Sequence, residues 1–87
     1  MRIRIKLFAL LYKYIPEGTA TGPTGSEADL DVADGATISS VFDHLALPNE
    51  FCHLVLVNGI FIPPSERPGH ALVEGDHLAV WPPVAGG

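Results

Sequence analysis

Apolar and basic residues alternate over residues 1–8 of this chain. The apolar set is Ile3, Ile5 and Leu7, and the basic set is Arg2, Arg4 and Lys6. Because successive side chains of a strand point to opposite faces, the pattern predicts a strand with one buried and one solvated face. Phe8 has the parity of the solvated face, which is unusual for a large aromatic residue.

A helical period replaces this alternation after Thr37. The apolar residues then recur at positions i, i+3, i+4 and i+7, as Ile38, Val41, Phe42 and Leu45. This spacing predicts one amphipathic helix whose apolar stripe packs on a sheet. Thr37 is a good N-cap, and Pro48 ends the helix.

The other apolar segments predict four further strands. Residues 28–32 alternate, with Leu30 and Val32 inward and Asp29 and Asp31 on a solvated face. The continuous apolar run 54–57 is typical of an interior strand. Asn58-Gly59 favours a type I′ hairpin turn, after which residues 60–62 return as an edge strand that ends at two prolines.

The last strand is predicted over residues 77–81, after a tight turn at Glu74-Gly75-Asp76. Leu78 and Val80 then point inward, so Trp81 shares the solvated face with Phe8. Residues 9–14 are expected to form a short helical turn, and residues 65–70 a loop.

Together these elements predict an α+β fold of the β-grasp, ubiquitin-like type. We expect a mixed sheet of four to five strands with one main helix on one face, in one domain of residues 1–83. The Thr- and Gly-rich stretch 17–27 is expected to be a mobile loop, and 84–87 a flexible tail. The predicted core is Ile3, Ile5, Leu7, Leu30, Val32, Ile38, Val41, Phe42, Leu45, Leu56, Leu78 and Val80.

Composition narrows the function. The formal net charge of −5 disfavours nucleic acid and anionic membranes, which both select a surplus of lysine and arginine. No signal peptide or apolar membrane span is expected, so the cytoplasm is the predicted location. The four histidines lack metal-ligand spacing, so no metal site is predicted. The single cysteine, Cys52, is expected to be a packed structural thiol.

The C-terminal residues carry the candidate chemistry. Pro82 and Pro83 have no backbone N–H, so they end the ladder and favour a stiff, extended exit. Gly86 and Gly87 have no side chains and fit a narrow slot, and a terminal glycine leaves its α-carboxylate sterically open. Such a tail suits delivery of a carboxylate into another protein's active site.

These residues carry a resemblance that covers nearly the whole chain. Val84-Ala85-Gly86-Gly87 after Pro82-Pro83, the segment Leu-Val-Glu-Gly-Asp-His-Leu at 72–78 and the pair Asn58-Gly59 resemble the MoaD/ThiS family of ubiquitin-like sulfur carriers. The ending is more similar to the molybdopterin synthase small subunits of that family than to its thiamin carriers. The long loop after Gly18 departs from the family.

The resemblance implies a site and its partners. Gly87 would be adenylated and then thiocarboxylated, and Pro82, Pro83, Val84, Ala85 and Gly86 would thread into the active site of a partner. An adenylating E1-like enzyme would supply ATP and magnesium, and a desulfurase or rhodanese-type enzyme the sulfur. Phe8, Phe61 and Trp81 would pack against the large subunit of molybdopterin synthase. The chain itself would bind no cofactor and would not be catalytic alone.

Other functions stay open at this point. Within the class, the carrier could serve thiamin or a tungsten-pterin cofactor. Outside it, the chain could be a ubiquitin-like modifier of protein lysines or a β-grasp interaction domain with an inert tail. The sequence also allows residues 17–27, or Tyr12 and Tyr14, to fold over the aromatic patch.

Overall fold

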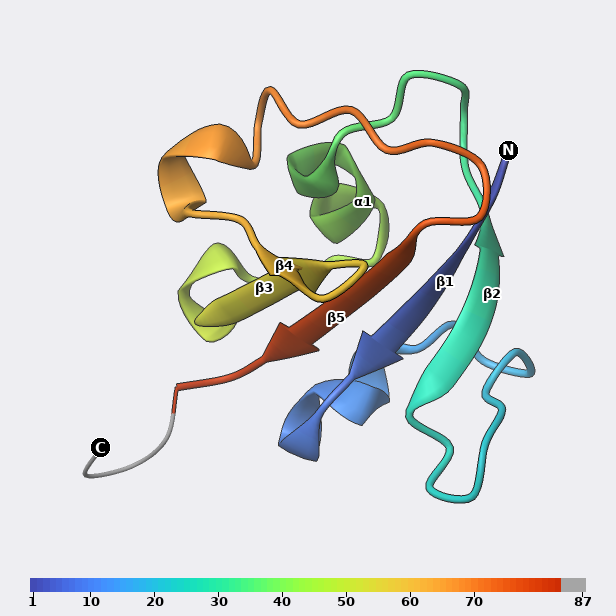
Figure 1. Cartoon of the computed structure of the whole chain (residues 1–87). Helices are drawn as coiled ribbons and strands as arrows, with labels where there is room; N and C mark the ends of the chain where they lie inside the picture. The colour runs from blue at the N-terminus through green and yellow to red at the C-terminus, as the bar shows by residue number, and fades with distance from the viewer. Residues whose placement is uncertain (84–87) are drawn as a thin grey trace.

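A mixed five-stranded sheet forms the framework of the molecule (Figure 1). The computed structural model describes residues 1–83. The strands are β1 (Arg2–Leu7), β2 (Glu27–Asp31), β3 (Leu54–Val57), β4 (Ile60–Phe61) and β5 (His77–Trp81), in the order β2-β1-β5-β3-β4. β1 and β5 run parallel, and the other neighbours are antiparallel. This confirms the predicted α+β fold of β-grasp type.

One helix, α1 (Ile38–His44), lies across one face of the sheet. Thr37 caps it as predicted: the Ser40 N–H donates to Thr37 Oγ1 at 3.1 Å, and the Thr37 N–H donates to Ser40 Oγ at 2.8 Å. This reciprocal pair satisfies backbone donors that the first turn of a helix leaves free. The described part of the chain also contains three short 3₁₀ helices: η1 (Ala9–Tyr14), η2 (Asn49–Phe51) and η3 (Pro64–Glu66).

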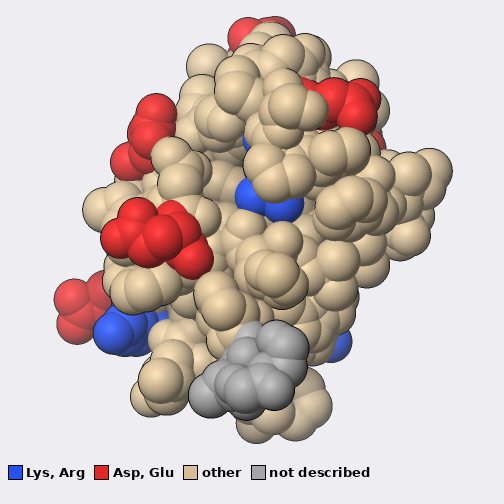
Figure 2. All heavy atoms as spheres, turned by 90° about the vertical axis from the view of Figure 1, so that its left-hand side faces the viewer, with Lys and Arg blue, Asp and Glu red and all other residues tan. Residues whose placement is uncertain are grey.

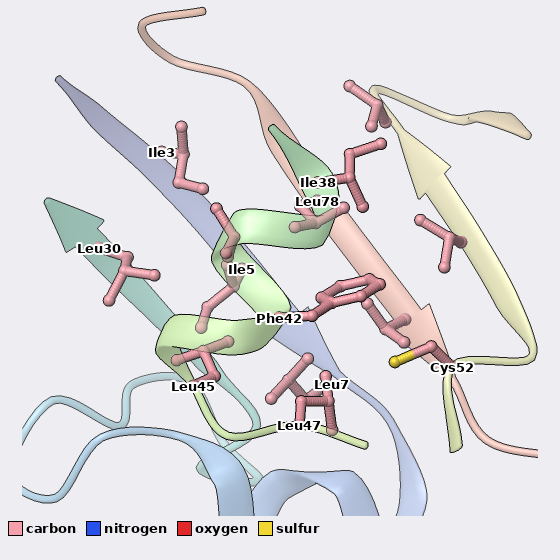
Figure 3. Close-up of a cluster of buried hydrophobic side chains, with 14 of the residues drawn as sticks. Ile3, Ile5, Leu7, Leu30, Ile38, Phe42, Leu45, Leu47, Cys52 and Leu78 are labelled. Carbon is pink, nitrogen blue, oxygen red and sulfur yellow. The ribbon is translucent and has the colours of Figure 1, made fainter. Parts of the chain in front are cut away.

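The core lies between α1 and the sheet (Figure 3). Phe42 projects from the helix among side chains of β1 and β5, such as Ile5 and Leu78, and only 1% of its surface is exposed. The predicted helix register is therefore confirmed. Cys52 is also buried, as predicted, with its sulfur directed toward this cluster.

The predicted core is wrong at Leu56, and Val32 lies only at its margin. In β3 the buried residues are Val55 and Val57, which pair with the inward-facing Val80 and Leu78 of β5. Leu56 therefore points to the opposite face, because neighbours on a strand alternate. Val32 follows the end of β2, where it is partly buried and packs against the core.

The turn between β3 and β4 also positions β5. Asn58 and Gly59 have φ values of 51° and 82°, which confirms the predicted type I′ turn, and β4 is an edge strand as expected. The Asn58 amide donates to Asp76 at 2.9 Å, and its oxygen accepts from the His77 N–H at 2.9 Å. These bonds fix the start of the strand that ends at the tail.

The Thr- and Gly-rich loop is partly organised. Thr21 and Glu27 form an isolated antiparallel bridge, and the hydroxyls of Thr24 and Ser26 lie 2.6 Å apart. Its predicted mobility stays a prediction.

Candidate functional site

The tail leaves the sheet at the end of β5. The last ladder bond there runs from the His53 N–H to the carbonyl oxygen of Trp81, at 2.9 Å. Pro82 and Pro83 follow without donors, so the ladder stops where the sequence predicts. Val84, Ala85, Gly86 and Gly87, which carry the predicted threading segment and carboxylate, lie outside the described residues.

Beside this exit, Phe8 and Trp81 stack on each other. Their ring centroids are 4.0 Å apart, with an angle of 7° between the ring planes. The Lys6 ammonium lies 4.9 Å from the centroid of the Phe8 ring. Both rings are half-buried, so the sequence placed them correctly on one face but did not show that they contact each other.

Phe61 joins the same face through β3. Trp81 pairs with Leu54, Ala79 pairs with Leu56, and Leu56 pairs with Phe61 on β4. We call the side of the sheet opposite α1 the open face; its apolar part consists of Phe8, Leu54, Leu56, Phe61, Ala79 and Trp81. Sequence reasoning missed Leu54 and Leu56, although the unbroken apolar run 54–57 signals apolar residues on both faces.

The neighbouring loop reaches only one end of this surface. Phe8, Tyr12 and Thr24 are among the residues that line a hollow of about 410 Å³, whereas Tyr14 lines a different groove. Phe61, at the other end, keeps 51% of its surface exposed. Residues of the 17–27 loop and Tyr12 therefore flank one end of the patch, Tyr14 packs against the core, and much of the patch stays open.

The other part of the open face is a ladder of charges between β1 and β2. Arg2 pairs with Asp31 at 3.1 Å, and Arg4 contacts Glu27 at 3.3 Å and Asp29 at 3.5 Å. The hydrogen bond from Arg2, with its positive charge, lowers the pKa of Asp31. Asp29 and Asp31 thus form the solvated strand face that the alternation predicts, and the open face divides into a charged half and an apolar half.

A buried arginine supports the strand next to the tail. The guanidinium of Arg67 donates to the carbonyl oxygens of Cys52 at 2.7 Å, Ile62 at 3.3 Å and His53 at 3.4 Å. Burial lowers the pKa of Arg67. The bond to the His53 carbonyl oxygen links Arg67 to the residue whose N–H donates to Trp81.

Figure 2 views the molecule from the side of η2 and η3. Most of this surface is uncharged, with separate acidic groups and with basic atoms in a central hollow.

The described residues offer little chemistry of their own. Burial raises the pKa of the Cys52 thiol to about 11, so it stays protonated and unreactive at neutral pH. Within residues 1–83 no group of three or more histidine, cysteine or acidic side chains is arranged to hold a metal. In that same range no helix is long and apolar enough to cross a membrane.

Within residues 1–83, the sheet topology, the helix α1 and the exit of the chain after β5 define a ubiquitin-like β-grasp domain. The chain belongs to the ThiS family, whose model matches residues 6–87. This confirms the resemblance to the MoaD/ThiS family. No curated protein matches the chain.

Solved structures support the same fold. SAMP1 of Haloferax volcanii, the small archaeal modifier protein 1, is 29% identical with a TM-score of 0.66, and the match covers 100% of both chains. The HVO 2177 protein of Haloferax volcanii is 25% identical with a TM-score of 0.73, and covers 100% of this chain and 87% of the other. A chain from the complex of subunits 1 and 2 of the molybdopterin-converting factor of Helicobacter pylori is 16% identical, with a TM-score of 0.56 and 100% of both chains covered. The last shows similarity of fold.

Proposed function

We propose that this protein is a sulfur carrier for molybdopterin biosynthesis, in which the Gly87 α-carboxylate is adenylated, converted to a thiocarboxylate and used as a sulfur donor. The observation that carries the proposal is the extent of the family match, which runs through Gly86 and Gly87 to the last residue. The tail is therefore part of what the chain shares with the ThiS family.

The chemistry explains why the carrier needs an activating enzyme. A carboxylate resists attack by sulfur because its carbonyl carbon is electron-rich. Attack of the Gly87 carboxylate on the α-phosphorus of ATP releases pyrophosphate and gives an acyl adenylate. Hydrosulfide then forms the C–S bond as the C–O bond to AMP breaks, which leaves a thiocarboxylate. A persulfide donor adds one step, in which a thiol reduces the S–S bond.

The partners follow from this division of work. An E1-like enzyme supplies the nucleotide site, ATP and magnesium, and a desulfurase or rhodanese-type enzyme supplies sulfur. The proposed location of these steps is the cytoplasm. The apolar part of the open face docks on the large subunit of molybdopterin synthase, with Phe8, Phe61 and Trp81 as its aromatic contacts. Exposed apolar patches of this kind mark partner surfaces. The complex of subunits 1 and 2 in Helicobacter pylori is a precedent in a protein of this fold.

Intact-mass measurement of the protein from its native host tests the carrier function. We expect a fraction of molecules to be heavier by the difference between one sulfur and one oxygen, with the change in the C-terminal peptide. Co-purification with a synthase large subunit assigns the pterin pathway. Unmodified protein from cells that are making the cofactor contradicts the carrier proposal.

A one-residue extension tests the terminal carboxylate. An added residue after Gly87 moves the carboxylate by about 3.5 Å, which is too far for bonding to the α-phosphorus. We therefore expect the extended protein to lose adenylation in an ATP–pyrophosphate exchange assay and to keep the melting temperature of the wild type. An extended variant that forms an adenylate without being trimmed contradicts the mechanism.

A second function has one specific observation in its favour. SAMP1, a modifier protein by name, matches the whole chain at 29% identity. If the chain modifies proteins, a lysine amine attacks the adenylated Gly87 carbonyl, AMP leaves as the C–O bond breaks, the amine loses a proton and an isopeptide bond forms. Lysine conjugates in extracts of the native host, lost when Gly87 is extended, would support this role.

Co-purification with thiamin enzymes instead would assign the thiamin pathway.

A further inference from the structure

A second apolar surface lies at the root of the tail, beside Pro82 and Pro83. It is a groove of about 440 Å³ between η1 and η2. Leu10, Lys13, Tyr14, Phe51, Pro82 and Pro83 are among its lining residues. We call this the tail-root groove. The two prolines that carry the tail away from β5 form part of its wall.

The groove exposes large apolar side chains that the monomer does not bury. Leu10 keeps 72% of its surface exposed and Phe51 keeps 40%, while the neighbouring Leu11 is fully buried. Leu11 therefore anchors η1 in the core, and Leu10 is left facing solvent. Isolated exposed leucines are common, but a contiguous apolar lining beside a functional segment indicates a binding surface.

The backbone of η1 is held in an unfavourable conformation at this place. Ala9, its first residue, has a φ of 53°, in the left-handed region that alanine rarely adopts. The Leu11 N–H donates to the Phe8 carbonyl oxygen at 3.1 Å across this residue. Such conformations persist where the surrounding structure imposes them, often at ligand and partner sites. The wall of the groove is therefore a fixed feature of the fold.

We propose that the activating enzyme places an apolar side chain in the tail-root groove, and so encloses the root of the tail between the groove and the open face. The inference rests on the proposed function. The groove is continuous with the open face through the chain itself, since Phe8 precedes Ala9 and Trp81 precedes Pro82. An enzyme that takes up the tail must surround Pro82 and Pro83. Adenylation is the step that sulfur transfer and conjugation share, which selects the activating enzyme as the occupant.

The charge around the groove predicts the charge of the enzyme surface that binds there. The Lys13 ammonium lies over the Tyr14 ring, 5.6 Å from its centroid, and no acidic residue is among the residues that line the groove. The acidic side chains of β2 lie at the edge of the sheet, and β1 separates that strand from β5. An apolar side chain with a carboxylate beside it would therefore complement both the groove and Lys13.

The test compares Leu10→Gln with Val73→Gln. Val73 is 61% exposed and precedes β5, so it lies at the end of that strand opposite to the tail. In ATP–pyrophosphate exchange with the activating enzyme, we expect Leu10→Gln to raise the KM for the carrier about tenfold with kcat unchanged, the effect of losing one buried leucine. Val73→Gln should behave as the wild type, and both variants should melt like it. Lys13→Glu should also raise KM, by less at high salt.

Each outcome separates the two proposals. A KM for Leu10→Gln equal to that of the wild type, or an equal rise for Val73→Gln, overturns the tail-root groove as a docking site. Weaker binding of Leu10→Gln to the synthase large subunit, with normal exchange, assigns the groove to that enzyme and also overturns the proposal. Wild-type protein that supports no exchange with the activating enzyme overturns the proposed function, and the inference with it.

Discussion

The two faces of the sheet carry similar side chains in opposite environments. On the covered face, Phe42 of α1 packs between helix and strands and is 1% exposed. On the open face, Phe61 lies across from Leu56, and Phe8 stacks on Trp81. The covered face has a partner within the monomer, and the apolar half of the open face has none among the described residues.

The covered face therefore contributes to the stability of the fold, and the apolar half of the open face contributes to partner recognition. Removal of buried apolar surface from water is the main favourable term in folding, so the covered face supplies most of the stability. Apolar residues that stay in solvent contribute little to folding and become favourable contacts when a partner covers them. The charge ladder between β1 and β2 keeps the rest of the open face solvated and confines the apolar surface to the strands near the tail.

The largest expected effect comes from the same substitution on the two faces. Phe42→Ala should lower the free energy of unfolding by about 3–5 kcal/mol, because it opens a cavity in the core. Phe61→Ala, the matched control, should lower it by less than about 1 kcal/mol, since it removes only a cross-strand contact on an edge strand. Urea denaturation of both variants measures the difference. Similar losses for the two phenylalanines would mean that the open face also stabilises the monomer.

The helix could be predicted from the sequence, while one strand could not be oriented. In α1, polar residues such as Ser39, Ser40 and Asp43 separate the apolar positions, so only one register buries the stripe. In β3 all four residues are apolar, and alternation alone does not say which pair is buried. Pairing with β5 decides it, because Val55 lies beside the inward-facing Val80.

The surroundings of the tail were also beyond sequence reasoning, for a different reason. The stretch 65–70 predicts a loop, yet Arg67 is 6% exposed and binds the carbonyl oxygens of Ile62 and of the more distant Cys52 and His53. Likewise, residues 9–14 predict a helical turn, but the tertiary contacts of η1 determine that Leu11 is buried and Leu10 exposed. Local pattern predicts an element, and long-range contacts set its orientation.

The next largest effect is expected on binding. Trp81→Ala should weaken the complex with the synthase large subunit by about 2 kcal/mol or more, the usual threshold for a dominant interface residue. The free energy of unfolding should fall by about 1 kcal/mol, the value of an aromatic stack such as that with Phe8. Calorimetric titration and thermal melting measure the two quantities. Unchanged affinity together with a strongly lowered melting temperature would make Trp81 a core residue and remove it from the docking surface.

The smallest effect is a dependence on pH that only the covered face should show. Burial raises the pKa of Cys52 from 9.0 to about 11, so above pH 9 the unfolded chain releases a proton that the folded protein retains. The stabilisation is complete below pH 9 and is lost progressively as the pH rises toward 11. Urea denaturation from pH 8 to 11 should therefore show a steeper loss of unfolding free energy for the wild type than for Cys52→Ala.

A cysteine moved to the open face provides the control for this prediction. Leu56→Cys in the Cys52→Ala background should restore little of that slope, because its thiol lies at a partly solvated position. Equal slopes in all three proteins would mean that water reaches both faces of the sheet alike.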